Sequence, residues 1–337
     1  MPHATRPRVA IVTTGGTIDS LGADRLDLAA YLDTGVRLEP GALVASIAPE
    51  LAAVADVREV QFRRLRAHAL TDLDLADLVE LVRDLFARDE ADGVVISHGT
   101  NTLEETAWLL HLVLDDERPV VVMGAMRPAS AVSADGPLNL VNATRVAAAP
   151  AARGLGGLVV LDDTIHPARS VTKHHTMRVD AFGDGASGPL GWVDGDGRVV
   201  LDHRPARATS LRGAFSPADL RALPRVDIVV TYQGADGALV DAAVAAGARG
   251  VVSAGTGAGY PTPGEVEALA RAGAAGVTIV QSTRVGAGRV PAITSLVDRG
   301  WVAADDLQPW KARILLRLAL ATGHTTREAL QALFEAE

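Results

Sequence analysis

Residues 93–113 constrain the fold of this chain more than any other stretch. An apolar run at 93–96 stops at a His-Gly-Thr turn, and Glu104 and Glu105 then open a leucine-rich segment with helical periodicity. This pattern predicts a buried parallel strand, a tight turn and a helix that begins at the turn. Ligands of open α/β sheets bind at the carboxyl ends of the strands. We therefore expect Thr100, in the turn, to present its hydroxyl at a binding site.

A second strand end carries another threonine. Residues 8–13 form an apolar run that ends in a double-glycine turn followed by Thr17. Glycines permit positive φ angles and let a ligand approach backbone amides closely. The polar segment 19–40, around Tyr31, has no full helical period and is long for a connection, which is typical of a lid or of a passive surface loop.

Strand patterns alternate with helical patterns along the chain, which predicts an α/β fold with a mostly parallel sheet and flanking helices. Prolines punctuate a charged stretch near residues 200–225, after which the alternation restarts. We expect an N-terminal catalytic α/β domain at 1–205, a linker at 206–219 and a smaller C-terminal α/β domain at 220–337. The expected strands are 57–62, 93–97, 119–124, 157–161, 226–231, 250–253 and 277–280, and the expected helices are 72–86, 138–147, 309–322 and one from about 326.

The composition excludes several classes of function. A net charge of −9 argues against a nucleic-acid surface, which requires clustered Lys and Arg. The chain has no cysteine, so disulfides, thiolate metal ligands and cysteine nucleophiles are excluded. No apolar segment is long enough for a membrane span, and the N-terminus has no signal-peptide core. We therefore expect a soluble cytoplasmic protein without membrane or nucleic-acid partners.

The two threonines suggest a hydroxyl nucleophile, which needs a nearby base and donors for an oxyanion. Lys173, just after the 157–161 strand, is the candidate base, because a desolvated lysine loses its proton more easily. The alternative is that both threonines are ordinary strand-end residues. Residues 255–259 match a dinucleotide fingerprint only partly, and His166, His174 and His175 lack metal-binding spacing, so we expect neither cofactor nor metal.

Ordered sequence motifs over nearly the whole chain resemble the bacterial-type L-asparaginase family. The motifs are Thr14-Gly-Gly-Thr-Ile18, Ser97-His-Gly-Thr-Asn-Thr-Leu-Glu-Glu-Thr106, Gly124-Ala-Met-Arg-Pro128, Ser133-Ala-Asp-Gly-Pro137, Val171-Thr-Lys173, Val252-Ser-Ala-Gly255, Ser282-Thr-Arg-Val285 and Leu307-Gln-Pro-Trp-Lys-Ala-Arg313.

The resemblance implies a two-domain α/β amidohydrolase in which Thr17 is the primary nucleophile. It also implies that Thr100 is a second catalytic threonine paired with Lys173, and that Tyr31 is the tyrosine of the lid. Backbone groups at Gly16 and Gly99 would hold the oxyanion, and the Ala125 carbonyl would approach the leaving amide. Family members form homodimers or homotetramers in which a neighbour's C-terminal domain completes each site, so we expect a homo-oligomer.

Three positions depart from the family pattern at the end of the site that binds the substrate's amino-acid head. Asn101 replaces an aspartate that pairs with the α-ammonium, which removes a charge-assisted hydrogen bond worth about 1.5–3 kcal/mol. It also removes an anion beside Lys173, which should lower the pKa of that lysine. Ala67-His68 aligns with a Ser-Gln pair, and Ala258 aligns with an asparagine lent across the dimer.

These departures leave three functional hypotheses open. The best single substrate is L-asparagine, hydrolysed to L-aspartate and ammonia. The second hypothesis is an amidase or lactamase that acts on an amide without a free α-amino-acid head. Under either hypothesis we expect His68 and Asn101 to contact the substrate. The third is a non-catalytic amide-binding protein, against which the three intact residues Thr17, Thr100 and Lys173 argue.

Overall fold

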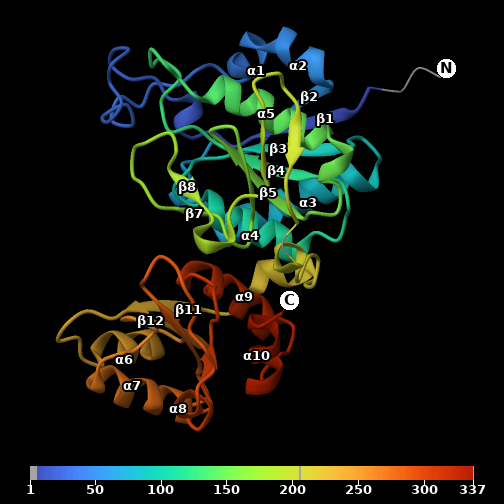
Figure 1. The fold of residues 1–337 in the computed structure, drawn as a ribbon. Helices are drawn as coiled ribbons and strands as arrows, with labels where there is room; N and C mark the ends of the chain where they lie inside the picture. Colours follow the sequence, from blue (N-terminus) through green and yellow to red (C-terminus); the bar gives the residue numbers. More distant parts are fainter. Residues whose placement is uncertain (1–5, 205, 337) are drawn as a thin grey trace. The chain divides into compact units, whose positions relative to one another are not determined.

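The computed structural model describes residues 6–204 and 206–336. Residues 1–5, which belong to the N-terminus expected to lack a leader, and Pro205, at the expected domain boundary, lie outside this description. Contacts divide the chain into two compact units between Gly213 and Ala214 (Figure 1). This division falls within the stretch expected to be a linker, and the boundaries of the two domains stay a prediction.

The first unit is built on one large sheet whose strand order is β10-β9-β6-β5-β4-β3-β1-β2. Strands β2, β1, β3, β4 and β5 run parallel, and β6, β9 and β10 extend the sheet in antiparallel pairing. The strands are β1 (Arg8–Thr13), β2 (Asp56–Gln61), β3 (Gly93–Ser97), β4 (Val120–Met123), β5 (Gly157–Leu161), β6 (Thr164–Pro167), β9 (Gly191–Val193) and β10 (Val199–Leu201).

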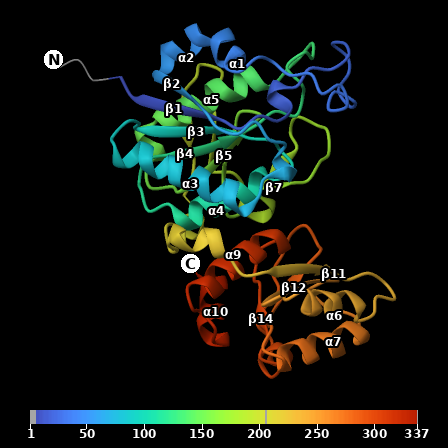
Figure 2. The same ribbon diagram turned by 180° about the vertical axis from the view of Figure 1, so that it is seen from behind.

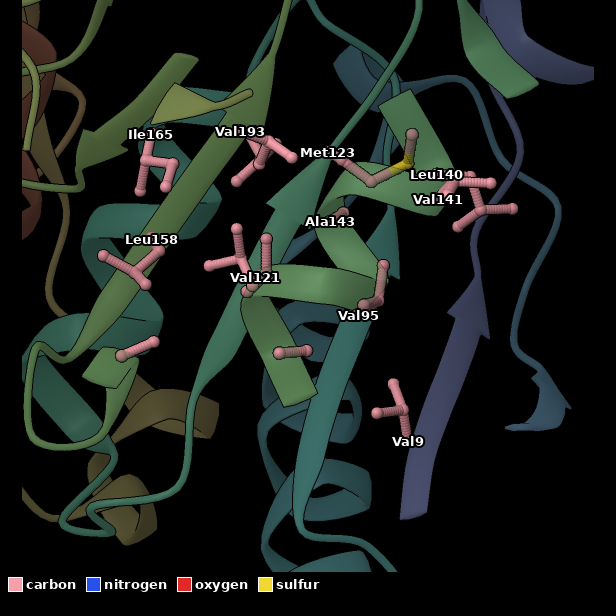
Figure 3. Close-up of a cluster of buried hydrophobic side chains, with 14 of the residues drawn as sticks. Val9, Val95, Val121, Met123, Leu140, Val141, Ala143, Leu158, Ile165 and Val193 are labelled. Atoms are coloured by element: carbon pink, nitrogen blue, oxygen red, sulfur yellow. The ribbon is translucent and has the colours of Figure 1, made fainter. Parts of the chain in front are cut away.

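Helices cover both faces of this sheet, which explains why every residue of its central strands is buried. On one face α5 packs against β3, β4 and β5 and is flanked by α2 (Figures 1 and 2). Figure 3 shows Leu140 and Ala143 of α5 in a buried cluster with Val95 and Val121 of the sheet. The other face is covered by α4, with α3 beside it. The helices are α1 (Ala42–Ser46), α2 (Ala48–Val54), α3 (Asp72–Ala87), α4 (Leu103–Val113) and α5 (Gly136–Ala148).

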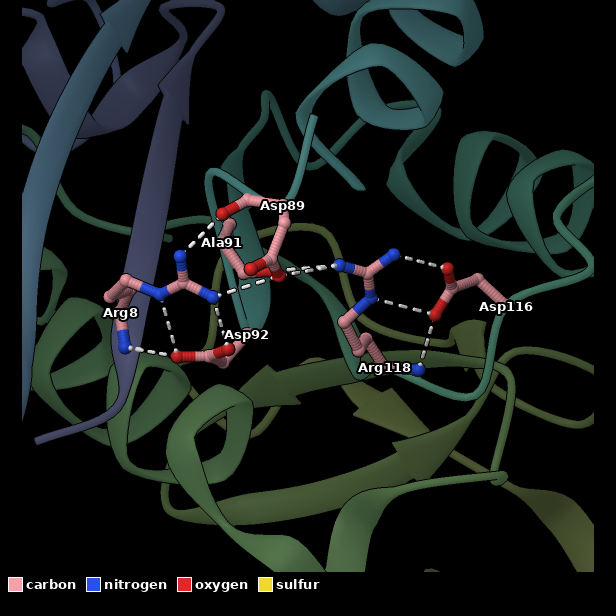
Figure 4. Close-up of polar contacts among 6 residues, drawn as sticks. All are labelled: Arg8, Asp89, Ala91, Asp92, Asp116 and Arg118. Atoms are coloured by element: carbon pink, nitrogen blue, oxygen red, sulfur yellow. Dashed lines mark hydrogen bonds and ion pairs between the residues drawn. The ribbon is translucent and has the colours of Figure 1, made fainter. Parts of the chain in front are cut away.

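An ion-pair network joins the amino ends of neighbouring strands (Figure 4). The Arg8 backbone N–H and its Nε both donate to Asp92 Oδ2, at 2.8 and 3.1 Å, and so connect β1 to the start of β3. Arg118, before β4, pairs with Asp116 at 2.6 Å. The network lies at the end of the sheet opposite to the strands' carboxyl ends, which stay available for a site.

The second unit has a smaller parallel sheet in the order β11-β12-β13-β14. Its strands are β11 (Val226–Val230), β12 (Gly250–Gly255), β13 (Thr278–Thr283) and β14 (Val302–Ala303), and its helices are α6 (Ala238–Ala245), α7 (Pro263–Ala274), α8 (Thr294–Val297), α9 (Pro309–Ala321) and α10 (Arg327–Phe334). Across the described ranges, no helix has both the length and the apolar character to cross a bilayer.

The predicted fold class is confirmed, with a large, mostly parallel sheet and a smaller parallel one. The prediction missed α1, α2 and the antiparallel extension of β6, β9 and β10. These strands are only three or four residues long, and Leu51 alone is buried among the residues of α1 and α2. Elements this short do not complete the periodic pattern by which helices and strands are distinguished.

Two glycine turns at the carboxyl ends of β1 and β3 contact each other. Thr13 is the register partner of Ser97, so the turns start side by side. Gly16 has φ of 124°, and a Cβ built on it would lie 2.8 Å from the Gly99 Cα. A Cβ on Gly99 would in turn lie 2.9 Å from the Ala67 Cβ. The β1 turn can therefore approach the β3 turn this closely only with glycine at position 16, and the turn that carries Ala67 can approach the β3 turn this closely only with glycine at position 99.

We predict that Gly16→Ala lowers the thermal stability of the chain. The new methyl group would contact rigid backbone, and residue 16 has a φ angle that L-residues rarely adopt. Together these effects should lower the free energy of unfolding by about 1–3 kcal/mol. Gly35→Ala is the matched control, because Gly35 also has positive φ, 66°, but open space around its Cβ position. Calorimetric melting should show a larger loss for Gly16→Ala than for Gly35→Ala. Equal losses would mean that the contact between the turns contributes nothing.

Candidate active site

A small cavity of about 100 Å³ opens where β1 and β3 end. It brings together residues from the two glycine turns, the 19–40 segment, the turn after β2 and the strand β7 (Thr172–Lys173). Ala125 is buried and its neighbour Met126 lines the cavity instead. Ala258 is exposed on the second unit. The predicted site residues that line the cavity are Gly16, Thr17, Tyr31, His68, Gly99, Thr100, Asn101 and Lys173.

Thr17 is buried at the start of a short 3₁₀ helix, Thr17–Asp19, directly after Gly16. Its Oγ1 lies 3.0 Å from the Tyr31 Oη, so the two hydroxyls share a hydrogen bond. Contacts near both ends of the 19–40 segment, which carries Tyr31, hold this segment in place. Asp19 accepts a 2.7 Å ion pair from Arg64, and the Leu38 N–H donates to the Asp19 carbonyl at 2.8 Å. These contacts hold Tyr31 over Thr17 although the segment has little regular structure.

Thr100 forms the second hydroxyl centre. Its Oγ1 accepts a 2.8 Å hydrogen bond from the Lys173 Nζ. The Lys173 backbone N–H donates to Glu104 Oε1 at 3.0 Å, so the first turn of α4 holds the strand that carries the lysine. Two points of the lysine, its main chain and its side-chain tip, are thereby fixed against the 100–104 stretch.

A buried polar cluster anchors the β7–β8 hairpin on its other side. Strand β8 (Phe182–Gly183) pairs with β7, and Asp184 follows it directly. The Asp184 carboxylate lies 2.6 Å from His166 Nδ1 and accepts from the Ser170 hydroxyl at 3.1 Å. The hairpin that positions Lys173 is therefore connected to β6, within the main sheet.

Burial lowers the pKa of the Lys173 ammonium below its ordinary value, and the charge of Glu104 acts in the opposite direction. Burial dominates because desolvation disfavours the charged form. The lowered pKa gives a larger fraction of neutral amine, which can accept a proton from a hydroxyl or a water molecule. Lys173 thus has both the contact and the electrostatic environment that a general base requires.

His98 is a fully buried neighbour of this centre that sequence reasoning did not single out. Burial lowers the pKa of its imidazole to about 4, so the ring is neutral near pH 7. Nδ1 donates to the Gly99 carbonyl at 2.8 Å, and Nε2 accepts from the Thr106 hydroxyl at 3.0 Å. The ring therefore ties the Gly99 turn to α4. In the sequence, the position of His98 directly before Gly99 and Thr100 is the feature that could have indicated this role.

Comparisons with known proteins agree with this architecture. Residues 8–207 match the family model "Asparaginase, N-terminal", and residues 225–334 match "Glutaminase/Asparaginase C-terminal domain". L-asparaginase 2 of Bacillus subtilis is 39% identical over 97% of this chain and 86% of its own length. The chain belongs to the asparaginase family. The prediction of a hydrolase that acts on an amide C–N bond is thereby confirmed.

Other members of the asparaginase family are similarly close. The glutaminase-asparaginase of Pseudomonas fluorescens is 38% identical over 97% of this chain and 89% of its own length. The crystal structure of a probable cytoplasmic L-asparaginase from Campylobacter jejuni superposes with a TM-score of 0.92. It is 35% identical and covers 98% of this chain and 100% of its own. The similarity therefore includes both units.

We predict that Glu104→Gln shifts the pH profile of this asparaginase-family chain to lower pH. The glutamine keeps an oxygen that can accept from the Lys173 N–H, but it removes the negative charge that raises the pKa of Lys173. With a lower pKa the lysine stays neutral at lower pH, so the acid limb of kcat/KM moves down. Glu105→Gln, on the same helix, is the control. A profile that stays in place or moves upward in Glu104→Gln would contradict this account.

Proposed function

We propose that the chain hydrolyses the terminal carboxamide of a small amino acid, with L-asparagine as the first substrate, and releases ammonia. The pairing of two threonines around one cavity, Thr17 with Tyr31 and Thr100 with Lys173, carries this proposal. Curated relatives named L-asparaginase 2 and glutaminase-asparaginase support it. The small cavity is in keeping with a low-molecular-weight substrate.

In the first step the Thr17 Oγ attacks the amide carbonyl carbon. Tyr31 accepts the proton of Thr17 and passes its own proton to the amide nitrogen, which leaves as ammonia once the C–N bond breaks. An acyl ester then links the substrate to Thr17. Backbone N–H groups of the Gly16 and Gly99 turns would stabilise the oxyanion that precedes this ester.

In the second step water hydrolyses the ester. Lys173, acting through the Thr100 hydroxyl, removes a proton from the water, and the resulting hydroxide attacks the acyl carbon. The C–O bond to Thr17 breaks, the threonine oxygen regains a proton and the carboxylic acid is released. Direct attack of this activated water on the amide, without an ester on Thr17, is the alternative sequence of steps.

We predict that Thr17→Ala, Thr100→Ala and Lys173→Met each reduce ammonia release from L-asparagine by more than about a thousandfold. The assay uses the purified full-length chain. Thr164→Ala, which changes a hydroxyl outside the cavity, is the control and should keep full activity. Mass spectrometry of Thr100→Ala after incubation with substrate should find the acyl group on the peptide that contains Thr17.

Two results would contradict parts of this proposal: the first concerns the ester on Thr17, and the second concerns amide hydrolysis itself. Substantial turnover by Thr17→Ala, with none by Thr100→Ala, would favour direct attack by water. Binding of L-asparagine or L-glutamine without any ammonia release by the unaltered chain would leave only the amide-binding protein.

We further propose that the chain forms a homodimer or homotetramer, in which a neighbour's second unit completes each cavity. Exposed apolar side chains at the carboxyl ends of β11 and β12 support an interface there: Val230, Tyr232 and Tyr260 are each about half exposed. Sedimentation equilibrium should give two or four times the chain mass of 35.0 kDa. A monomer at working concentration would rule this assembly out.

We also propose that the enzyme works in the cytoplasm. The description of the Campylobacter jejuni protein as probable cytoplasmic supports this placement. Cell fractionation with an antibody to the full-length chain would test it, and recovery in an extracytoplasmic fraction would contradict it.

A further inference from the structure

The candidate active site has a cationic wall although the chain as a whole carries a net charge of −9. Arg37 and Arg66 line the cavity together with Lys173, and His68 adds an imidazole ring. Among the lining residues that the structure describes, none is Asp or Glu. A cleft lined by charges of one sign concentrates ligands of the opposite sign. The part of the cavity that one chain forms is therefore suited to a substrate with net negative charge.

The turn that carries Arg66 and His68 packs against the turn after β3, residues 98–101, which we call the catalytic turn. Ala67, between them, is buried and lies against Gly99. Thr102, just beyond the catalytic turn, donates from its hydroxyl to the Ala67 carbonyl at 3.1 Å. Arg66 and His68 thus extend from a fixed point beside Gly99, while their side chains are exposed.

Arg66 also connects this turn to the segment that carries Tyr31. Its Nη2 donates to the Leu32 carbonyl at 2.9 Å. A guanidinium has five N–H donors in a planar fork that matches a carboxylate, so one bond to Leu32 leaves donors for a ligand. Arg37, in the same segment, lines the cavity and donates from Nη1 to the Arg64 carbonyl at 3.3 Å. Backbone carbonyls therefore hold both guanidinium groups, and both groups line the same cavity as Tyr31.

An α-ammonium group in this cavity would be repelled by the two guanidinium groups. Asn101, which follows Thr100 in the catalytic turn, provides a neutral amide. A carboxylate in the same cavity would be attracted by the arginines and could form charge-assisted hydrogen bonds with them. Recognition by charge therefore favours an amide with a carboxylate and without an ammonium.

We propose that the preferred substrates are monoamides of short dicarboxylic acids, recognised through their free carboxylate by Arg66 and Arg37. This inference rests on the proposed amide hydrolysis and specifies its substrate class. Water adds across the C–N bond and the new carboxylic acid gives its proton to the released ammonia, so a monoanionic amide becomes a dicarboxylate and an ammonium ion. The α-ammonium of L-asparagine contributes nothing to recognition in this cavity.

Three amides separate the contributions of the two head groups. Succinamate has the carboxylate only, L-asparagine has both groups, and 3-aminopropanamide has the ammonium only. We predict that kcat/KM for succinamate equals or exceeds that for L-asparagine and that 3-aminopropanamide is the poorest substrate. A preference of about tenfold or more for L-asparagine over succinamate, which corresponds to about 1.4 kcal/mol, would overturn the inference while the proposed hydrolysis stands.

Variants of Arg66 identify the group that binds the carboxylate. Arg66→Gln should raise KM for succinamate by about tenfold to a hundredfold and change kcat less, since a charge-assisted hydrogen bond is lost. Arg66→Lys should recover part of this loss. Turnover of 3-aminopropanamide should not fall, whereas a general loosening of the 19–40 segment would slow all three substrates alike and overturn the assignment. Arg58→Gln, an exposed arginine paired with Glu90 outside the cavity, is the control.

Asn101→Asp tests the charge of the cavity from the opposite direction. A carboxylate beside Thr100 should lower kcat/KM for succinamate. The ratio of kcat/KM for L-asparagine to kcat/KM for succinamate should therefore rise. An unchanged ratio would contradict the dependence on cavity charge.

Calorimetry on Thr17→Ala tests recognition independently of turnover. Binding of succinamate that is lost when Arg66→Gln is added would support the inference even if no amide were hydrolysed and the proposed function failed. Absence of succinamate binding would overturn the inference.

Discussion

The contact between the glycine turns at Gly16 and Gly99 is the constraint on which the candidate active site depends. Strands β1 and β3 are neighbours in a parallel sheet, so both turns emerge at the same edge. A side chain at position 16 would force these two turns apart, and Thr17 and Thr100 would then no longer line one cavity. A side chain at position 99 would displace the turn that carries Ala67. The network around Arg8 at the other end of the strands secures their relative register, although its exposed parts contribute little free energy individually.

The lysine of the site is positioned by elements that are far apart in the chain. Lys173 contacts Thr100 by its side chain and Glu104 by its main chain, and Asp184 connects its hairpin to β6. Burial in this arrangement lowers the pKa of the lysine, and Glu104 limits the decrease. The same residues therefore supply both geometry and electrostatics, which is a common property of sites that transfer protons.

Much of the fold could be predicted because the central strands are buried on both faces and appear as continuous apolar runs. Residues 93–97 and 157–161 were predicted with the bounds that the structure has. The paired cavity around Thr17 and Thr100 also followed from two strand ends with hydroxyls. The roles of His98 and Glu104 could not be predicted, because each depends on a partner that only the packing of α4 and β7 supplies. The binding role of Arg66 could not be predicted either, because exposed arginines are common after an edge strand.

The sequence by itself determined the α/β class, the family and the hydroxyl-bearing turns, because these depend on local periodicity and on short motifs. Only the tertiary structure decided how Tyr31 reaches Thr17, how Lys173 reaches Thr100 and which cations line the cavity. Those arrangements depend on the packing of turns and loops that have no period of their own. Charge in the cavity is likewise a property of the folded chain, since its arginines come from an irregular segment and from a turn that only packing against Gly99 brings to the site.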